Sequence, residues 1–106
     1  MIIMKQELVD LLEILINELD RDLNRPQYYI FQKDLFNQLS YEKWAYKELL
    51  EEVESSANGP YAVVERFCKK MNDYSLVNPK TSRMFSAAYD AGMNVLDLII
   101  RSEYVD

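Results

Sequence analysis

Three prolines and two glycines in 106 residues constrain this chain more than any other feature of its sequence. β-Sandwiches and barrels need turn residues every ~8–12 positions, and this chain does not supply them. Pro26, Pro60 and Pro79 instead divide the sequence into long uninterrupted segments. Proline starts a helix readily and is excluded from its interior, so this arrangement predicts an all-α fold.

Apolar residues recur at three- and four-residue spacing in four long segments, which predicts four amphipathic helices. We expect the first over residues 5–24, with Ile14 alone pointing away from its leucine stripe. The next begins at Ser40, taken as an N-cap, and stops at 55–60. A third covers 60–74, and the last runs from the Asn78-Pro79 start signal to about 102. Short connections predict antiparallel neighbours, hence one small bundle-like domain over 1–106.

A shorter segment, residues 27–39, is rich in aromatic side chains and precedes the expected helix start at Ser40. The spacing of Phe31, Leu35 and Leu39 is helical, so we expect a short fifth helical segment there. In the helix over 60–74 the expected buried residues are Val63, Val64, Phe67, Met71 and Tyr74. In the last helix, small residues should let a neighbouring helix come close; they are Ala88, Ala91 and Gly92.

Charge is divided unevenly along the chain, whose formal net charge is −6. Residues 1–57 hold twelve acids and six bases, whereas residues 58–106 hold six of each. The single cysteine, Cys68, cannot form an internal disulfide, and we expect it to be a structural thiol. With no recognisable leader and no apolar run of ~18 residues, we expect a cytoplasmic protein without a membrane span.

The chain has no histidine, which excludes several classes of catalytic site. It cannot build the Glu-x-x-His di-iron site of helical bundles, a zinc hydrolase site, or a histidine-dependent triad. Neither a Walker loop nor a Gly-x-Gly-x-x-Gly turn is present. We therefore predict no catalytic residue, no cofactor and a non-enzymatic protein.

One set of carboxylates supports an alternative interpretation. Glu48-Leu49-Leu50-Glu51 resembles the Glu-x-x-Glu element of MazG-type nucleotide pyrophosphohydrolases, and that resemblance implies a magnesium-dependent enzyme. The family's second acidic element is missing, since three residues after Glu65 stands Cys68. We expect Asp90 and Asp97 of the last helix to face these glutamates. The alternative metal set comprises Glu48, Glu51, Glu52 and Asp90; the other reading is a solvated acidic face.

A small basic cluster is expected around the turn between the last two helices: Arg66, Lys69, Lys70, Lys80 and Arg83. Nucleic-acid binding of this kind rests on many uncompensated Lys or Arg contacts with phosphates. The acidic balance of the whole domain opposes such contacts, so we do not expect direct nucleic-acid binding.

The leading functional hypothesis is a protein-interaction module that meets a basic partner. Six acids are expected to contact that partner: Glu7, Asp10, Glu13, Glu48, Glu51 and Glu52. Four aromatic residues are expected to anchor the contact, with packing inside their own domain as the alternative: Tyr28, Tyr29, Tyr41 and Trp44. In size and charge the chain is similar to phage-borne anti-CRISPR and other DNA-mimic inhibitors, which suggests a phage or bacterial origin and a partner that binds nucleic acid.

A third hypothesis is a structural homodimer with no other partner. Four apolar residues lie off the main stripes of the first and last helices: Ile14, Tyr89, Met93 and Ile100. Such residues form a second buried surface if they are contiguous, and are ordinary isolated apolar residues if they are not.

Overall fold

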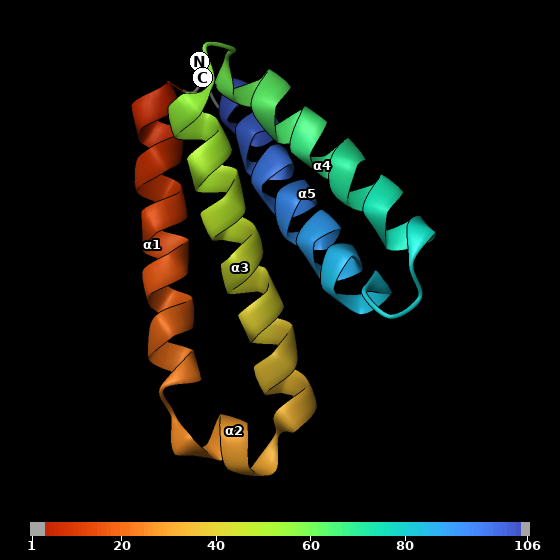
Figure 1. Ribbon diagram of the computed structural model, residues 1–106. Coiled ribbons are helices and arrows are strands. Elements are labelled where there is room, and N and C mark those ends of the chain that lie inside the picture. The colour runs from red at the N-terminus through yellow and green to blue at the C-terminus, as the bar shows by residue number, and fades with distance from the viewer. Residues whose placement is uncertain (1–3, 105–106) are drawn as a thin grey trace.

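The computed structural model describes residues 4–104, with side chains through Arg101, and Figure 1 shows its arrangement. The described residues form five helices and no strand, which confirms the all-α prediction. The helices are α1 (Lys5–Leu23), α2 (Pro26–Phe31), α3 (Lys33–Ser55), α4 (Pro60–Val77) and α5 (Ser82–Tyr104). Within the described residues, no helix is long and apolar enough to cross a membrane.

Two of the prolines mark helix boundaries as expected, with Pro26 and Pro60 in the first turns of α2 and α4. Pro79 lies in the turn before α5, which begins three residues later, at Ser82. The predicted boundary at Ser40 is wrong, because the chain breaks earlier, at Gln32, where φ is −132° and ψ is 62°. Ser40 lies inside α3, and its Oγ donates a hydrogen bond of 2.8 Å to the carbonyl of Phe36. A serine that bonds back to the preceding turn is compatible with a helix interior, so the residue type alone did not mark a start.

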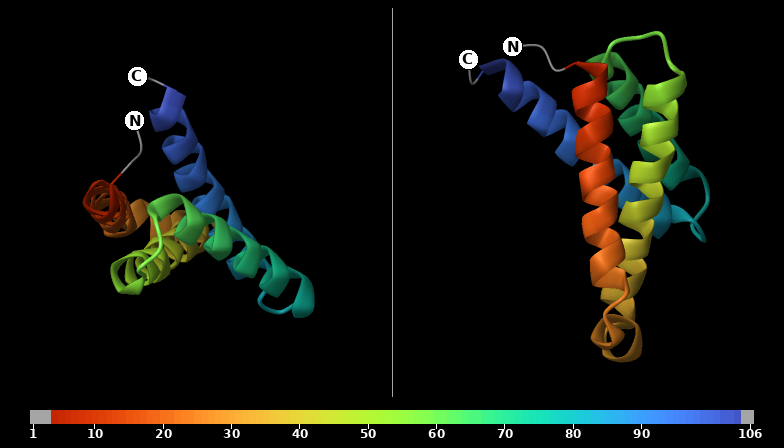
Figure 2. Two further views of the ribbon diagram at one scale, coloured as in Figure 1. Left: turned by 90° about the horizontal axis from the view of Figure 1, so that it is seen from above. Right: turned by 90° about the vertical axis from the view of Figure 1, so that its left-hand side faces the viewer.

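The four long helices form two antiparallel hairpins. α1 and α3 lie side by side with α2 at their far turn, and α4 and α5 form the second hairpin (Figure 1). Figure 2 shows that this second hairpin is inclined to the first and that α1 begins near the end of α5. α3 is central, since it contacts α1, α4 and α5. One core joins the four helices, and its fully buried residues include Leu8, Leu12, Leu49, Phe67 and Ile99.

α4 and α5 approach each other closely at Gly92. A Cβ atom on Gly92 would lie 2.8 Å from Cys68 Sγ and 3.0 Å from Phe67 Cδ1, distances that leave no room for a methyl group. Ala88 and Ala91 on the same helix are buried. The expected close contact at these small residues is therefore confirmed. The expected burial of Tyr74 is wrong, because this residue is 46% exposed near the end of α4. Its ring packs edge-to-face with Phe85, with centroids 5.2 Å apart.

Within the first hairpin, formed by α1, α2 and α3, buried residues occur in one part only. Between residues 20 and 44, all of which the structure describes, no residue is buried. We call residues 20–44 the arm, and residues 5–19 together with 45–55 the covered half of the hairpin. Figure 1 shows the reason, since α2 and its flanking turns lie beyond the reach of α4 and α5. Only its upper part, at Gln38 and Trp44, meets the start of α5; toward α2 the arm is a pair of helices with no third helix against it.

Candidate interaction surfaces

The covered half of the first hairpin accounts for the whole net charge of −6, because the rest of the chain is balanced. It holds eight acids, and Lys5 and Lys47 are its two bases. Because α1 and α3 are antiparallel, the start of α1 lies beside the end of α3; Lys5 Nζ donates to the carbonyls of Glu54 at 3.0 Å and Ser56 at 3.4 Å. The six predicted partner-binding acids therefore gather at one end of the molecule, which we call the acidic end: Glu7, Asp10, Glu13, Glu48, Glu51 and Glu52.

Three of these acids already have partners within the fold. Glu7 Oε1 accepts a hydrogen bond of 3.2 Å from the backbone N–H of Met4, at the start of α1. Asp10 accepts one of 2.9 Å from the side-chain amide of Gln6, and Glu52 forms an ion pair with Lys70 of α4.

The other three are Glu13, Glu48 and Glu51, and within residues 4–101 no side chain forms an ion pair with any of them. Glu13 and Glu51 are exposed and Glu48 is half-buried. These three carboxylates are available to a partner.

The structure separates the predicted aromatic anchors from the acidic end. Tyr28 and Tyr29 lie in α2, at the far turn of the hairpin, and Tyr41 lies about 15 Å along α3 from Glu51 at the helical rise per residue. Trp44 packs edge-to-face on Phe85, with ring centroids 5.8 Å apart, and belongs to the border of the core. The acids and the tyrosines of α2 therefore form two surfaces at opposite ends of the first hairpin. Trp44 packs against the core of its own domain.

An exposed apolar surface lies at the end of the arm; it includes Tyr29, one of the predicted anchors, whereas the exposure of Ile30, Phe31 and Leu35 was not expected. We call it the apolar tip: Tyr29 is 45% exposed, Ile30 54%, Phe31 81% and Leu35 39%. α2 buries none of its residues, and Tyr29 meets Phe36 edge-on at 6.1 Å between centroids. The spacing of Phe31, Leu35 and Leu39 indicated one continuous stripe, but the break at Gln32 turns Phe31 out of it.

The carboxylates proposed for a metal site do not come together. Within the described residues, no group of three Asp, Glu or Cys side chains is placed to hold a metal ion. The expectation that Asp90 faces the glutamates of α3 is wrong, because Asp90 shares a groove with Gln38, near the opposite end of α3. Asp97 forms an exposed pair with Arg101 at 3.0 Å, as the four-residue spacing indicated.

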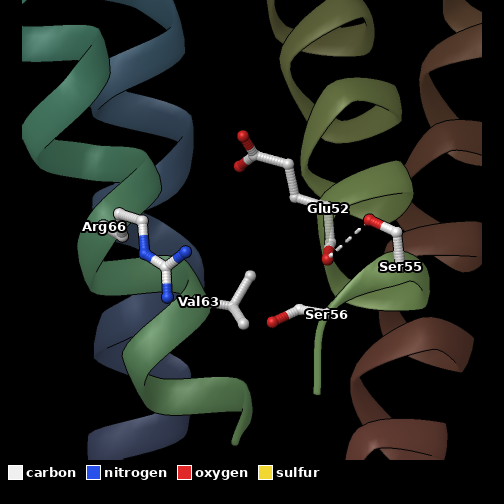
Figure 3. A pocket seen from close by; sticks show the side chains of 5 residues that line it. All are labelled: Glu52, Ser55, Ser56, Val63 and Arg66. Atoms are coloured by element: carbon white, nitrogen blue, oxygen red, sulfur yellow. Dashed lines mark hydrogen bonds between the residues drawn. The ribbon is translucent and has the colours of Figure 1, made fainter. Parts of the chain in front are cut away.

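A shallow pocket lies beside the acidic end, between the last turn of α3 and the first turns of α4 (Figure 3). Its volume is about 250 Å³, and it is lined by Glu52, Ser55, Ser56, Val63 and Arg66. Figure 3 shows Glu52 and Arg66 on opposite walls, with Ser55 Oγ bonded to the Glu52 carbonyl at 3.4 Å. Pockets that enclose small ligands are mostly apolar and usually larger than about 300 Å³. This open, polar hollow is instead a shallow depression in the protein surface.

Cys68 is not a reactive nucleophile. It is buried against the α4–α5 contact, and burial raises the pKa of its thiol from 9.0 to about 11, with Glu65 adding to the effect. The thiol is therefore protonated at neutral pH. Burial also raises the pKa of the Tyr46 hydroxyl, and Glu42 contributes to that rise.

The predicted basic cluster is divided. Lys80 lies in the turn between α4 and α5 and Arg83 follows it, whereas Arg66 lies about 16 Å along α4 from the last residue of that helix. Lys70 is committed to Glu52 and lies 5.8 Å from the centre of the Phe67 ring. The bases do not form one surface.

The four residues of the predicted dimer surface have different environments. Tyr89 and Ile100 are half-buried and pack against the core. Ile14 is 56% exposed on α1, and Met93 is 39% exposed on α5.

Comparison with known proteins does not identify a family for this chain. No protein-family model, curated protein or solved structure matches this chain. The geometry and charge of the two surfaces are therefore the basis for a functional proposal.

Proposed function

We propose that this protein is a non-enzymatic interaction module whose acidic end binds a basic surface of another protein. The observation that carries the proposal is the placement of eight acids and two bases in the covered half of one helical hairpin. The arm of the same hairpin holds four acids and four bases. Negative charge is thus concentrated on one end of a molecule whose remaining parts are balanced.

Three carboxylates of the acidic end can form ion pairs with a partner. Glu13, Glu48 and Glu51 have no internal ion partner to give up among the described residues, so pairing them with a partner's Lys or Arg breaks no existing contact. Concentrated charge of one sign speeds the encounter with a basic protein and makes it sensitive to salt.

The finer form of the proposal is an inhibitor of a nucleic-acid-binding protein. Glu7, Asp10 and Glu13 follow one another at three-residue intervals, a rise of about 4.5 Å per step along α1. Phosphates along one DNA strand likewise form a row of negative charges, with a shorter axial rise of about 3.4 Å per step. Two adjacent helices with such carboxylates would occupy a channel built for a phosphate backbone. A protonated, buried Cys68 suits the reducing cytoplasm in which such a target works.

Charge reversal tests the proposal with a matched control. The test variant combines Glu13→Lys, Glu48→Lys and Glu51→Lys. The control combines Asp34→Lys, Asp73→Lys and Asp90→Lys, three exposed acids outside the acidic end. Both variants change the net charge from −6 to zero. Immobilised protein would be used to capture partners from a lysate of the native host at low and high salt.

We expect wild-type protein and the control to capture the same basic protein at low salt and to release it at high salt. The test variant should lose this capture, with unchanged helicity by circular dichroism. Equal losses in both variants would show that net charge alone is responsible. Capture of an acidic protein, or capture unaffected by the test variant, would refute the proposal.

A further inference from the structure

Three aromatic rings meet where α3, α4 and α5 come together, and we call them the aromatic junction. Trp44 of α3 packs edge-to-face on Phe85 of α5, with ring centroids 5.8 Å apart. Tyr74 of α4 packs on the same phenyl ring, with centroids 5.2 Å apart. Trp44 and Phe85 are half-buried, whereas Tyr74 is 46% exposed. The aromatic junction is therefore accessible from solvent.

A carboxylate without an ion partner lies one helical turn from Trp44. Glu48 follows Trp44 by four residues on α3, and side chains at this spacing are neighbours on a helix surface. α3 and α4 lie antiparallel and inclined to each other (Figure 1), and the ion pair of Glu52 with Lys70 fixes how they align. Glu48 and Tyr74 are each one turn farther from the α3–α4 connection than that ion pair. The half-buried Glu48 therefore lies on the part of α3 that borders the aromatic junction.

The neighbouring turn shows the same combination of groups together with a cation. Lys70 pairs with the carboxylate of Glu52, and its Nζ lies 5.8 Å from the centre of the Phe67 ring. One turn farther along, the carboxylate is Glu48 and the rings are those of the aromatic junction. α4 contributes no base there, since Tyr74 stands four residues after Lys70. Within residues 4–101, no side chain supplies a cation to Glu48.

We infer that Trp44, Glu48 and Tyr74 form a site for an arginine side chain of the basic partner. A guanidinium group stacks on aromatic rings, meets a carboxylate through two parallel N–H groups and is less strongly hydrated than an ammonium group. These properties favour arginine over lysine at this site. The inference rests on the proposed function, because it names the residue type that anchors the basic partner. Of the four predicted aromatic anchors, Trp44 alone lies within one helical turn of the acidic end.

The fluorescence of Trp44 reports on this arginine site, because Trp44 is the only tryptophan in the chain. The whole chain would be titrated at low salt with hexa-arginine and hexa-lysine peptides, which carry the same charge. We expect a saturable change in fluorescence and an affinity for hexa-arginine that is about fivefold higher or more, because of guanidinium stacking. A diffuse acidic surface would bind both peptides equally, and that result would overturn the inference.

Two pairs of matched variants, all of which keep Trp44, locate the site. Glu48→Gln should abolish the preference for arginine, whereas Glu51→Gln, which removes an exposed carboxylate of the same helix, should retain it. Tyr74→Leu should weaken hexa-arginine binding about threefold or more, because it removes an aromatic ring from the site. Tyr29→Leu should not, although Tyr29 is 45% exposed and also packs edge-on against a phenylalanine. Equal effects within either pair would overturn the inference.

The titrations and the capture experiment separate the arginine site from the proposed function. Salt-dependent capture of a basic protein, combined with equal binding of the two peptides, would overturn the arginine site and leave the proposed function standing. Preferential hexa-arginine binding that depends on Glu48 and Tyr74, without capture of a basic protein, would support the arginine site and refute the proposed function.

Discussion

The covered half and the arm are built from the same two helices, yet they differ in burial and in charge. The covered half contributes Leu8, Leu12 and Leu49 to the core with no exposed area. The arm buries none of its 25 residues, 20–44. The covered half is strongly acidic and the arm is neutral. Stability therefore resides where α4 and α5 lie against the hairpin, and each end of the hairpin presents a surface of different chemistry.

The largest expected effect is the difference in stability between core and arm substitutions. Leu49→Ala removes a fully buried side chain and should lower the free energy of unfolding by about 2–5 kcal/mol. Phe31→Ala removes a side chain that is 81% exposed and should change the free energy of unfolding of the monomer by less than about 0.5 kcal/mol. Urea denaturation at low protein concentration measures both. Similar losses would show that the arm packs more tightly than described.

The buried thiol of Cys68 should make the stability of the protein depend on pH, which an exposed thiol on the arm would not do. Its pKa is raised from 9.0 to about 11 in the folded protein. The stabilisation of the folded state by the protonated thiol is therefore fully present below pH 9 and is lost as pH rises toward 11. That shift corresponds to roughly 2–3 kcal/mol.

Urea denaturation between pH 8 and 11 would measure this contribution as the difference between wild-type protein and Cys68→Ala. The wild type should lose more stability than Cys68→Ala over this interval; parallel curves would contradict the prediction. At pH 8, Cys68 should react with a thiol reagent far more slowly than Gln32→Cys on the arm, because the native thiol is buried and protonated.

The close contact of α4 with α5 should be sensitive to a single methyl group. Gly92→Ala forces Cys68 or the buried Phe67 ring to move, which costs about 1–3 kcal/mol, and the better helix propensity of alanine offsets about 1 kcal/mol. We expect a net loss of roughly 1 kcal/mol, measured by thermal and urea unfolding. Gly59→Ser is the control, since nothing lies within 4 Å of its Cβ and serine is a favoured N-cap residue. A stabilised Gly92→Ala variant would refute the close contact.

Much of the fold was predictable because its signals are local. The prolines at 26 and 60 limit which residues begin a helix, and the spacing of Val63, Val64 and Phe67 identifies the buried face of α4. The break at Gln32 was missed because Ser40 offered a more familiar start, while the actual break carries no proline or glycine.

The surfaces were less predictable because periodicity reveals which face is apolar and not what covers it. Leu35 and Leu49 occupy the same stripe of α3, and a sequence pattern treats them alike. Their exposures differ because the second hairpin lies against α3 at Leu49 and not at Leu35. For the same reason, sequence alone grouped the acids with the tyrosines of α2 and placed Asp90 opposite Glu48. The gathering of six acids at one end followed once α1 and α3 were antiparallel.

The most direct test of the acidic end is the salt dependence of binding to the captured partner once it is purified. Dissociation constants would be measured between about 50 and 500 mM salt, a range over which exposed charges become screened. For the wild-type protein and the Asp34/Asp73/Asp90 control, we predict affinity that falls steeply with salt. For Glu13→Lys/Glu48→Lys/Glu51→Lys, we predict at least tenfold weaker binding at low salt and a flat salt dependence. Equal affinities and equal salt dependence in all three proteins would contradict the account.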